Sequence, residues 1–217
     1  MEAQNHRQVK VTTADPSALG LFGLAMVTFV ASSQKLGITE GLSYLLPWVF
    51  FLGGLAQIYA SILDAKLNNI FGTTAFAAFG LFWFGVGTTW LIQLGFFGEV
   101  LAANADPKQL GFAFIGYLIF SIFMTIGAME TNKVLFFIFI FIDFLFIGLS
   151  LSSFNIFYNV THMIAAIAEM CIALLSFYAS AANVLNTHFG QVVLPIGKPF
   201  GIFKKQQVHV HVKKRVS

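Results

Sequence analysis

Charged side chains are scarce in this sequence, and their scarcity excludes an ordinary soluble globular protein. Only 10% of the 217 residues are Asp, Glu, Lys or Arg, whereas 58% are hydrophobic and 27 are Phe. Soluble domains carry about 25% charged residues, because charge keeps their surface in water. Phe partitions readily into lipid, and no soluble core of this size needs so many Phe side chains. The composition therefore predicts an integral membrane protein.

Cysteine pairs and the common catalytic motifs are also missing. Cys171 is the single cysteine, so it cannot form an intrachain disulfide. The sequence contains no P-loop, no G-x-S-x-G turn, no paired-histidine helix motif and no cysteine cluster. We therefore expect no enzyme, no cofactor and no metal site. The net charge of +3 comes from basic residues at the termini and next to hydrophobic stretches, which indicates membrane topology and no nucleic-acid partner.

Long apolar runs dominate what remains. About 20 mostly apolar residues cross a bilayer as a helix. Six stretches meet this requirement, and they predict an all-α integral membrane fold of six transmembrane helices, at roughly 17–34, 45–63, 73–93, 110–129, 134–151 and 162–185. Residues typical of helix starts stand near their beginnings, namely Pro47, Thr73 with Thr74, Asp106 with Pro107, Asn132 and Asn159.

The basic residues are distributed unevenly between the two sides of these spans. If both termini are cytoplasmic, ten of the 12 Lys and Arg residues lie in the cytoplasm and only Lys35 and Lys108 lie outside. Cytoplasmic loops of membrane proteins carry such an excess of basic residues. We therefore predict an N-terminal cytoplasmic tail at 1–14, one six-helix domain at 15–197 and a basic cytoplasmic tail at 198–217, in a multi-pass protein of the cell (plasma or inner) membrane surrounded by lipid.

The change from polar tail to first span occurs at 15–21, the stretch Asp15-Pro16-Ser17-Ala18-Leu19-Gly20-Leu21. Asp15 can cap free backbone amides, and Pro16 suits the first helical position. A helix start directs unpaired N–H groups and a positive dipole end at its surroundings, so it attracts an anion without a cation in lipid. We therefore expect this helix start to be part of the functional site.

Two acidic residues, Asp143 and Glu169, lie deep inside predicted spans. A carboxyl group in a membrane is costly to bury, which makes it a candidate functional group. No Lys or Arg lies deep in a predicted span, so we expect each carboxyl to be protonated, hydrogen-bonded to a neighbouring helix or exposed to water. A proton relay and a structural role both stay open. The residues alone favour a small six-span channel, carrier or interaction protein.

Three stretches, in the same order, resemble signatures of the acetate uptake transporter family, also called succinate-acetate permeases. The first is 15–21, which is similar to the family's Asn-Pro-Ala-Pro-Leu-Gly-Leu. The second runs from Gly53-Gly54-Leu55-Ala56-Gln57 through Asn69-Ile70-Phe71-Gly72 to Phe82-Trp83, and the third comprises Val184-Leu185-Asn186, Phe189-Gly190 and Val193-Leu194-Pro195-Ile196-Gly197. The signature's Asn is Asp15 here, and its second Pro is Ala18.

The resemblance implies a homohexamer with one pore in each six-helix protomer. It also implies passage of acetate and related small monocarboxylates, in some members succinate, by an anion-channel or proton-coupled mechanism. The family's pore narrows at a Phe, a Tyr and a Leu, and the resemblance implies that Leu24, Phe79 and Ile142 stand at these positions here. Further pathway residues are expected to be Asp15, Pro16, Leu19, Gly20 and Gln57. A membrane sensor or scaffold without transport, and a channel for neutral small solutes, are the alternatives.

Overall fold

The computed structural model describes residues 13–203. Within this range, six helices are long and apolar enough to cross a membrane, as the sequence predicts. Of the predicted tails at 1–14 and 198–217, residues 1–12 and 204–217 lie outside the described residues.

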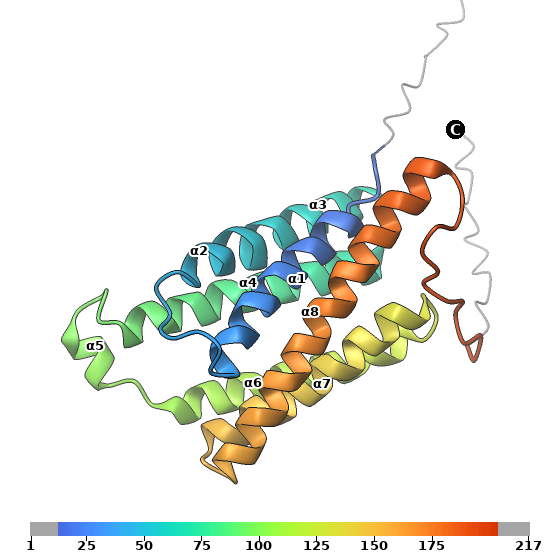
Figure 1. The fold of residues 1–217 in the computed structure, drawn as a ribbon. Coiled ribbons are helices and arrows are strands. Elements are labelled where there is room, and N and C mark those ends of the chain that lie inside the picture. The colour runs from blue at the N-terminus through green and yellow to red at the C-terminus, as the bar shows by residue number, and fades with distance from the viewer. Residues whose placement is uncertain (1–12, 204–217) are drawn as a thin grey trace, which may run out of the picture.

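The helices follow one another with short connections (Figure 1). The second span is continuous but composite, because α2, the π-helix η1 and α3 follow one another directly. Short α5 precedes the fourth span and was not predicted. The bounds are α1 Ser17–Lys35, α2 Leu46–Trp48, η1 Val49–Ala56, α3 Gln57–Lys66, α4 Ile70–Gln93, α5 Glu99–Ala103, α6 Pro107–Ala128, α7 Lys133–Ser153 and α8 Tyr158–Phe189.

Polar caps explain where several helices begin. The Asp106 side chain accepts the N–H of Lys108 (2.9 Å), and Asn132 accepts the N–H of Leu135 (2.9 Å), as expected from their place before α6 and α7. Two predicted starts are wrong. Asn69 caps α4 by accepting the N–H of Gly72 (3.2 Å), so this helix begins before Thr73 and Thr74. The last span begins at Tyr158, and its cap is the left-handed Phe157 rather than Asn159.

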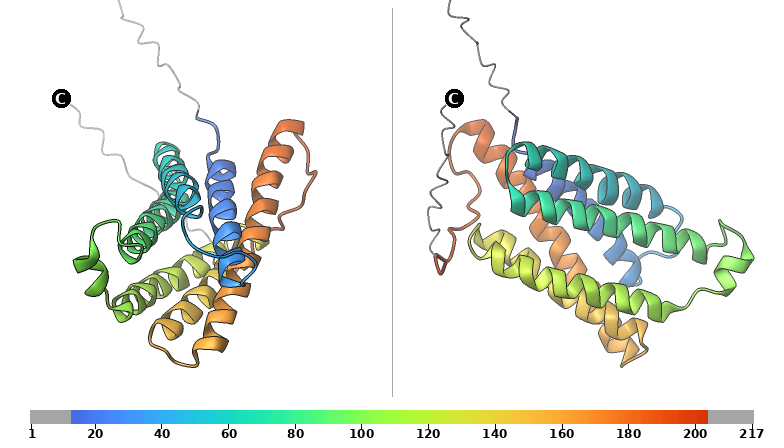
Figure 2. Two further views of the ribbon diagram at one scale, coloured as in Figure 1. Left: turned by 60° about the vertical axis from the view of Figure 1, so that its left-hand side comes forward. Right: turned by 180° about the vertical axis from the view of Figure 1, so that it is seen from behind.

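The helices form two groups that meet at α1 and α8 (Figure 2). In the first group, α1 and α4 both pack against η1 and α3. In the second group, α6 packs on α7, and α7 packs on α8. Contact between α1 and α8 joins the groups, whereas α4 and α6 touch only slightly. A passage can therefore run between α1, α4, α7 and α8.

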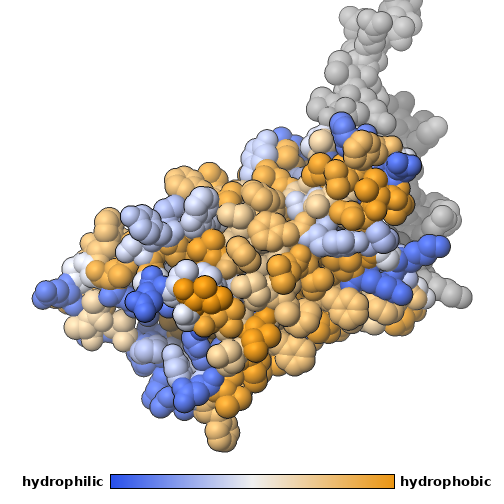
Figure 3. Space-filling model, in the orientation of Figure 1, coloured by the Kyte–Doolittle hydropathy of each residue, from blue (hydrophilic) through white to orange (hydrophobic). Residues whose placement is uncertain are grey.

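The two ends of the bundle differ in what they carry. At one end, which we call the terminal end, α1 begins and α8 ends (Figure 1). At the other, which we call the far end, α1 ends and α5 lies (Figure 1). Hydrophobic residues cover the middle of the visible surface, and hydrophilic residues gather toward both ends (Figure 3). This distribution fits a chain whose middle lies in lipid.

Glycines bring helix backbones close together at several crossings. A Cβ atom on Gly148 of α7 would meet the backbone of Thr161 and Ala165 on α8, and one on Gly23 of α1 would meet the carbonyl of Leu52 in η1. The lack of a side chain at these two glycines therefore lets neighbouring helices pack closely.

Candidate functional site

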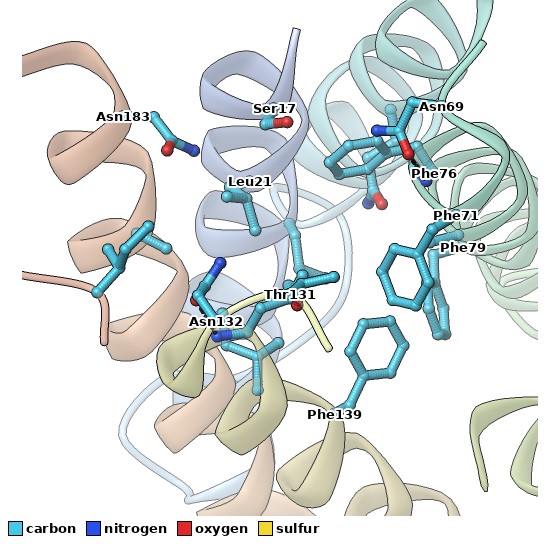
Figure 4. Close-up of a pocket in the computed structure, with 18 of the residues that line it drawn as sticks. Ser17, Leu21, Asn69, Phe71, Phe76, Phe79, Thr131, Asn132, Phe139 and Asn183 are labelled. Atoms are coloured by element: carbon cyan, nitrogen blue, oxygen red, sulfur yellow. Dashed lines mark hydrogen bonds between the residues drawn. The ribbon is translucent and has the colours of Figure 1, made fainter. Parts of the chain in front are cut away.

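A cavity of about 330 Å³ opens at the terminal end. Its mouth is polar, because Ser17, Asn69 and Asn132 come from helix starts that meet there and Asn183 comes from the last part of α8 (Figure 4). Deeper in, the lining is apolar and includes Leu21. A solute that enters this cavity therefore passes from hydrogen-bonding groups to hydrocarbon and aromatic surface. We call it the terminal cavity.

Gln57 is a buried polar side chain of this lining. It is fully buried, and its Nε2 atom donates to the carbonyl of Gly53 (3.0 Å). Its Oε1 atom has no hydrogen-bond partner in the described part of the chain. An unpaired buried amide oxygen costs free energy, so this side chain has hydrogen-bonding capacity left for a solute in the cavity.

An apolar neck lies at the inner end of the terminal cavity. Leu24, Phe79 and Ile142 line both the cavity and a space of about 10 Å³ beyond it. A single water molecule needs about this much room. Further apolar residues and one threonine complete the neck, namely Thr28, Phe82, Trp83, Leu145, Phe146 and Ile172. The three residues that the resemblance assigns to a constriction thus lie together.

The ring of Phe79 is fixed by its aromatic neighbours. It stacks on Phe146 with an interplanar angle of 10°, and it contacts Phe120 and Phe139 at centroid distances of 5.8 and 5.9 Å. Tyr117, on α6, lies against it as well and donates a hydrogen bond to the carbonyl of Ala78 (3.0 Å). A ring held on several sides makes a rigid wall of the neck.

A second cavity, of about 540 Å³, opens at the far end. Phe82 and Trp83 line both this cavity and the neck, so the neck lies between the two cavities. Residues of α1, α4, α6, α7 and α8 contribute to its wall. We call it the far cavity.

Helical periodicity explains how one helix can line the whole path. Residues spaced by three or four positions share a helix face. On α4, one such face passes from the terminal cavity through the neck to the far cavity, with residues Gly72, Ala75, Phe79, Phe82, Val86 and Trp90. On α7 the corresponding face comprises Leu135, Ile138, Ile142, Leu145, Leu149 and Ser152.

The first signature stretch caps α1 but lines the path only in part. Asp15 accepts the N–H of Ser17 (2.8 Å), and both residues line the terminal cavity. Pro16, Leu19 and Gly20 line none of the three spaces. Leu19 faces outward, and Gly20 provides room for the ring of Phe76.

The two deep carboxyl groups occupy different environments. Asp143 turns from the neck toward α6, where its Oδ2 atom accepts a hydrogen bond from Thr125 (2.7 Å). Glu169 lines the far cavity and pairs with Lys35, whose Nζ atom lies 2.8 Å from Glu169 Oε2. The expectation that no basic residue reaches these carboxyls is therefore wrong for Glu169. A lysine at the end of α1 can extend its long side chain along α8.

Sequence reasoning missed most of the polar lining. Asn69, Asn132 and Asn183 were not expected in the pathway, although the first two could have been found, because helix caps of neighbouring spans meet at one end of a bundle. Ile196 also lines the terminal cavity. It arrives through the segment after α8, which Asn186 holds by accepting the N–H groups of Val193 (2.7 Å) and Leu194 (2.9 Å).

Comparison with known proteins agrees with this arrangement. The chain is 31% identical over 186 residues to the succinate-acetate/proton symporter SatP of Escherichia coli. The alignment covers 85% of this chain and 96% of that relative. A solved structure of the bacterial acetate channel SatP superposes with a TM-score of 0.79 at 31% identity and covers 86% of this chain and all of that one. Ammonia transport outward protein 2 of Saccharomyces cerevisiae is 29% identical, over 90% of this chain and 69% of that protein.

One family model matches most of this chain. The match extends over residues 1–198 and includes the three signature stretches from which the resemblance was inferred. The inferred resemblance is confirmed, and so is the prediction of a multi-pass membrane protein. The chain belongs to the GPR1/FUN34/yaaH family.

Proposed function

We propose that this protein moves acetate and related small monocarboxylates across the cell membrane through a pore within each protomer. The observation that carries this proposal is the sequence of spaces inside one chain, in which a cavity at each end meets a narrow apolar neck. Membership of a family with succinate-acetate and acetate transporters supports the same conclusion.

The neck suits a small solute with an apolar end. A carboxylate loses much of its hydration in a space of about 10 Å³, and this loss is costly. The methyl group of acetate meets Leu24, Phe79 and Ile142 at little cost, whereas a longer or more hydrated anion meets a higher barrier. The unpaired Oε1 atom of Gln57 is a hydrogen-bond acceptor in the terminal cavity, so it suits the hydroxyl group of the protonated acid and not the carboxylate.

Passage of the anion alone and passage together with a proton both agree with this path. Asp143 is the first candidate for a proton relay, because it lies deep in a span and its Oδ1 atom has no hydrogen-bond partner among the described residues. Glu169 comes second, because it is paired with Lys35. At the start of α1, the Asp15 side chain already accepts the N–H of Ser17, so only the N–H groups of the following residues in the first turn are left for an anion at the terminal end. In our proposal the terminal end faces the cytoplasm, in accordance with the distribution of basic residues.

The proposed assembly is a homohexamer. Large apolar side chains are exposed on α6 at Phe112, Ile119 and Phe123, and such a surface suits contact with lipid or with another protomer. Mass determination of the purified protein in detergent tests the hexamer directly.

Ammonia and other neutral solutes are the second candidate class. The described neck has no ionisable side chain, and one relative is named for outward ammonia transport. A neutral molecule would cross such a neck without help from any charge. Stopped-flow permeability of vesicles to ammonia separates this activity from carboxylate transport.

Radiolabelled acetate uptake into proteoliposomes tests the proposed function. We expect uptake above that of empty vesicles, with an excess of unlabelled acetate competing. Absence of uptake, with and without an inward proton gradient, would contradict the proposal. Binding of a specific partner without any transport would instead favour a sensor or scaffold.

A further inference from the structure

The ion pair between Lys35 and Glu169 is oriented toward the far cavity. Glu169 is almost fully buried, with 1% of its side chain exposed, whereas 12% of the Lys35 side chain is exposed. Both residues line the far cavity. The carboxylate thus lies behind the ammonium group, and the positive end of the pair is the more accessible to a solute.

Apart from this pair, the lining of the far cavity is almost free of ionisable groups. The other described lining residues that can ionise are His162 and Tyr158, whose rings stack at a centroid distance of 5.4 Å. The remaining described lining residues are neutral polar or apolar. Lys35 therefore provides the one permanent positive charge among the described residues that line this space.

The ammonium group also lies close to the route through the neck. Its Nζ atom is 6.0 Å from the ring centroid of Trp90. Trp90 shares its helix face with Trp83, which borders both the neck and the far cavity. A charge here acts on a solute that is about to enter the neck or has just left it. Apolar walls lower the local dielectric, so the charge acts more strongly here than in open water.

We propose that the Lys35–Glu169 pair makes the far cavity anion-selective, with Lys35 attracting small carboxylates and Glu169 both holding the ammonium group in place and limiting its strength. An ammonium group without a partner would bind an anion tightly and slow its release. Conduction requires binding that is favourable enough for entry and weak enough for exit. The effect on acetate flux rests on the proposed function, but the selectivity of the cavity does not.

Three variants separate the charge of the pair from its packing. In Lys35→Glu/Glu169→Lys the ion pair is kept and its orientation is reversed, so that a carboxylate faces the cavity. In Lys35→Gln/Glu169→Gln both charges are removed with little change of volume. Glu169→Gln leaves Lys35 unpaired. The matched control is Lys108→Glu, which reverses an exposed charge at the same end but outside the cavity lining.

Quenching of Trp90 fluorescence measures the charge of the cavity without any transport. The protein is reconstituted with Trp48→Phe and Trp83→Phe, so that Trp90 is the single tryptophan, and the quenching constants for iodide and for neutral acrylamide are compared. The ratio of iodide to acrylamide quenching should fall at least about threefold in the reversed pair and should rise in Glu169→Gln. The neutral pair should lie between the parent and the reversed pair, and Lys108→Glu should leave the ratio unchanged.

Acetate uptake of the same variants then shows whether the charge matters for transport. Uptake should fall severalfold in the reversed pair, and in Glu169→Gln the half-saturating acetate concentration and the maximal rate should both fall. Quenching ratios that follow the charge support the selective cavity even if the parent moves no acetate, in which case only the proposed function fails. Equal ratios in the parent, the reversed pair and the neutral pair overturn the inference. If the reversed pair does not fold, the neutral pair alone decides.

Discussion

The hydroxyl group of Thr125 on α6 donates a 2.7 Å hydrogen bond to the carboxyl group of Asp143 on α7, one residue after Ile142 in the neck. The other carboxyl oxygen of Asp143 has no partner among the described residues. A change in the protonation of Asp143 would therefore alter the α6–α7 contact directly behind the neck.

We predict that Asp143→Asn flattens the dependence of acetate uptake on pH. The amide keeps the size of the side chain and can still accept the hydrogen bond from Thr125, but it cannot exchange a proton. Uptake is measured in proteoliposomes from acidic to neutral pH. Thr125→Val is the control, because it removes the hydrogen bond and leaves the titrating group. An unchanged profile in a folded Asp143→Asn protein would assign Asp143 a structural role.

Replacing Phe79 by Ala should widen the neck. The ring forms part of the wall of the narrowest space, so its removal should increase acetate flux or admit longer carboxylates such as butyrate. Competition of labelled acetate uptake by unlabelled acids of increasing length measures this change. Phe120→Ala is the matched control, because Phe120 contacts Phe79 but lines none of the three spaces. Equal selectivity in both variants would mean that Phe79 only packs.

Replacing Gln57 by Met should reduce acetate uptake severalfold. Methionine keeps the length of the side chain but loses the amide oxygen that can accept a hydrogen bond from the protonated acid, so the acid form would lose a polar partner in the terminal cavity. Gln57→Glu should reduce uptake further, since a second carboxylate repels the anion. Dose–response curves of uptake against acetate concentration test both changes. Uptake in Gln57→Met equal to the parent's would remove Gln57 from the pathway.

Replacing Gly148 by Ala should destabilise the bundle by about 1–3 kcal/mol, because a methyl group there meets the backbone of α8. Gly116→Ala is the control, since nothing lies within 4 Å of the Cβ position at Gly116. Thermal unfolding in detergent should show a lower midpoint for Gly148→Ala alone. Equal midpoints for the two variants would show that α7 and α8 can move apart without cost.

Much of the fold follows from local sequence. Apolar runs of span length identify the six transmembrane helices, and Asp106 and Asn132 mark two helix starts because each accepts a backbone N–H. The predicted helix start at Thr73 and Thr74 was wrong because Asn69 caps α4 four residues earlier in the chain. No local rule signals the left-handed Phe157 or the π-helix at Val49–Ala56, although the Gly53-Gly54 pair lies within it.

The site could be predicted only in part, for reasons of helix geometry. The motif drew attention to Pro16, Leu19 and Gly20, but the cavity-facing residues of α1 are Ser17, Leu21 and Leu24. These follow the spacing of one helix face, which the sequence already contained. The pairing of Lys35 with Glu169 could not be found in this way. It joins residues 134 positions apart, and it depends on how α1 crosses α8.

The reversal potential of reconstituted protein in an acetate gradient is the most direct test of the central claim that acetate crosses through the neck between the two cavities. In the presence of opposing gradients of acetate and protons, an anion channel gives a potential that follows acetate alone, and a coupled pathway gives one that also follows protons. We predict an acetate-dependent potential or flux that changes in Phe79→Ala and not in Phe120→Ala. If neither the reversal potential nor the uptake depends on the acetate gradient, in the parent and in both variants, acetate does not cross through the neck.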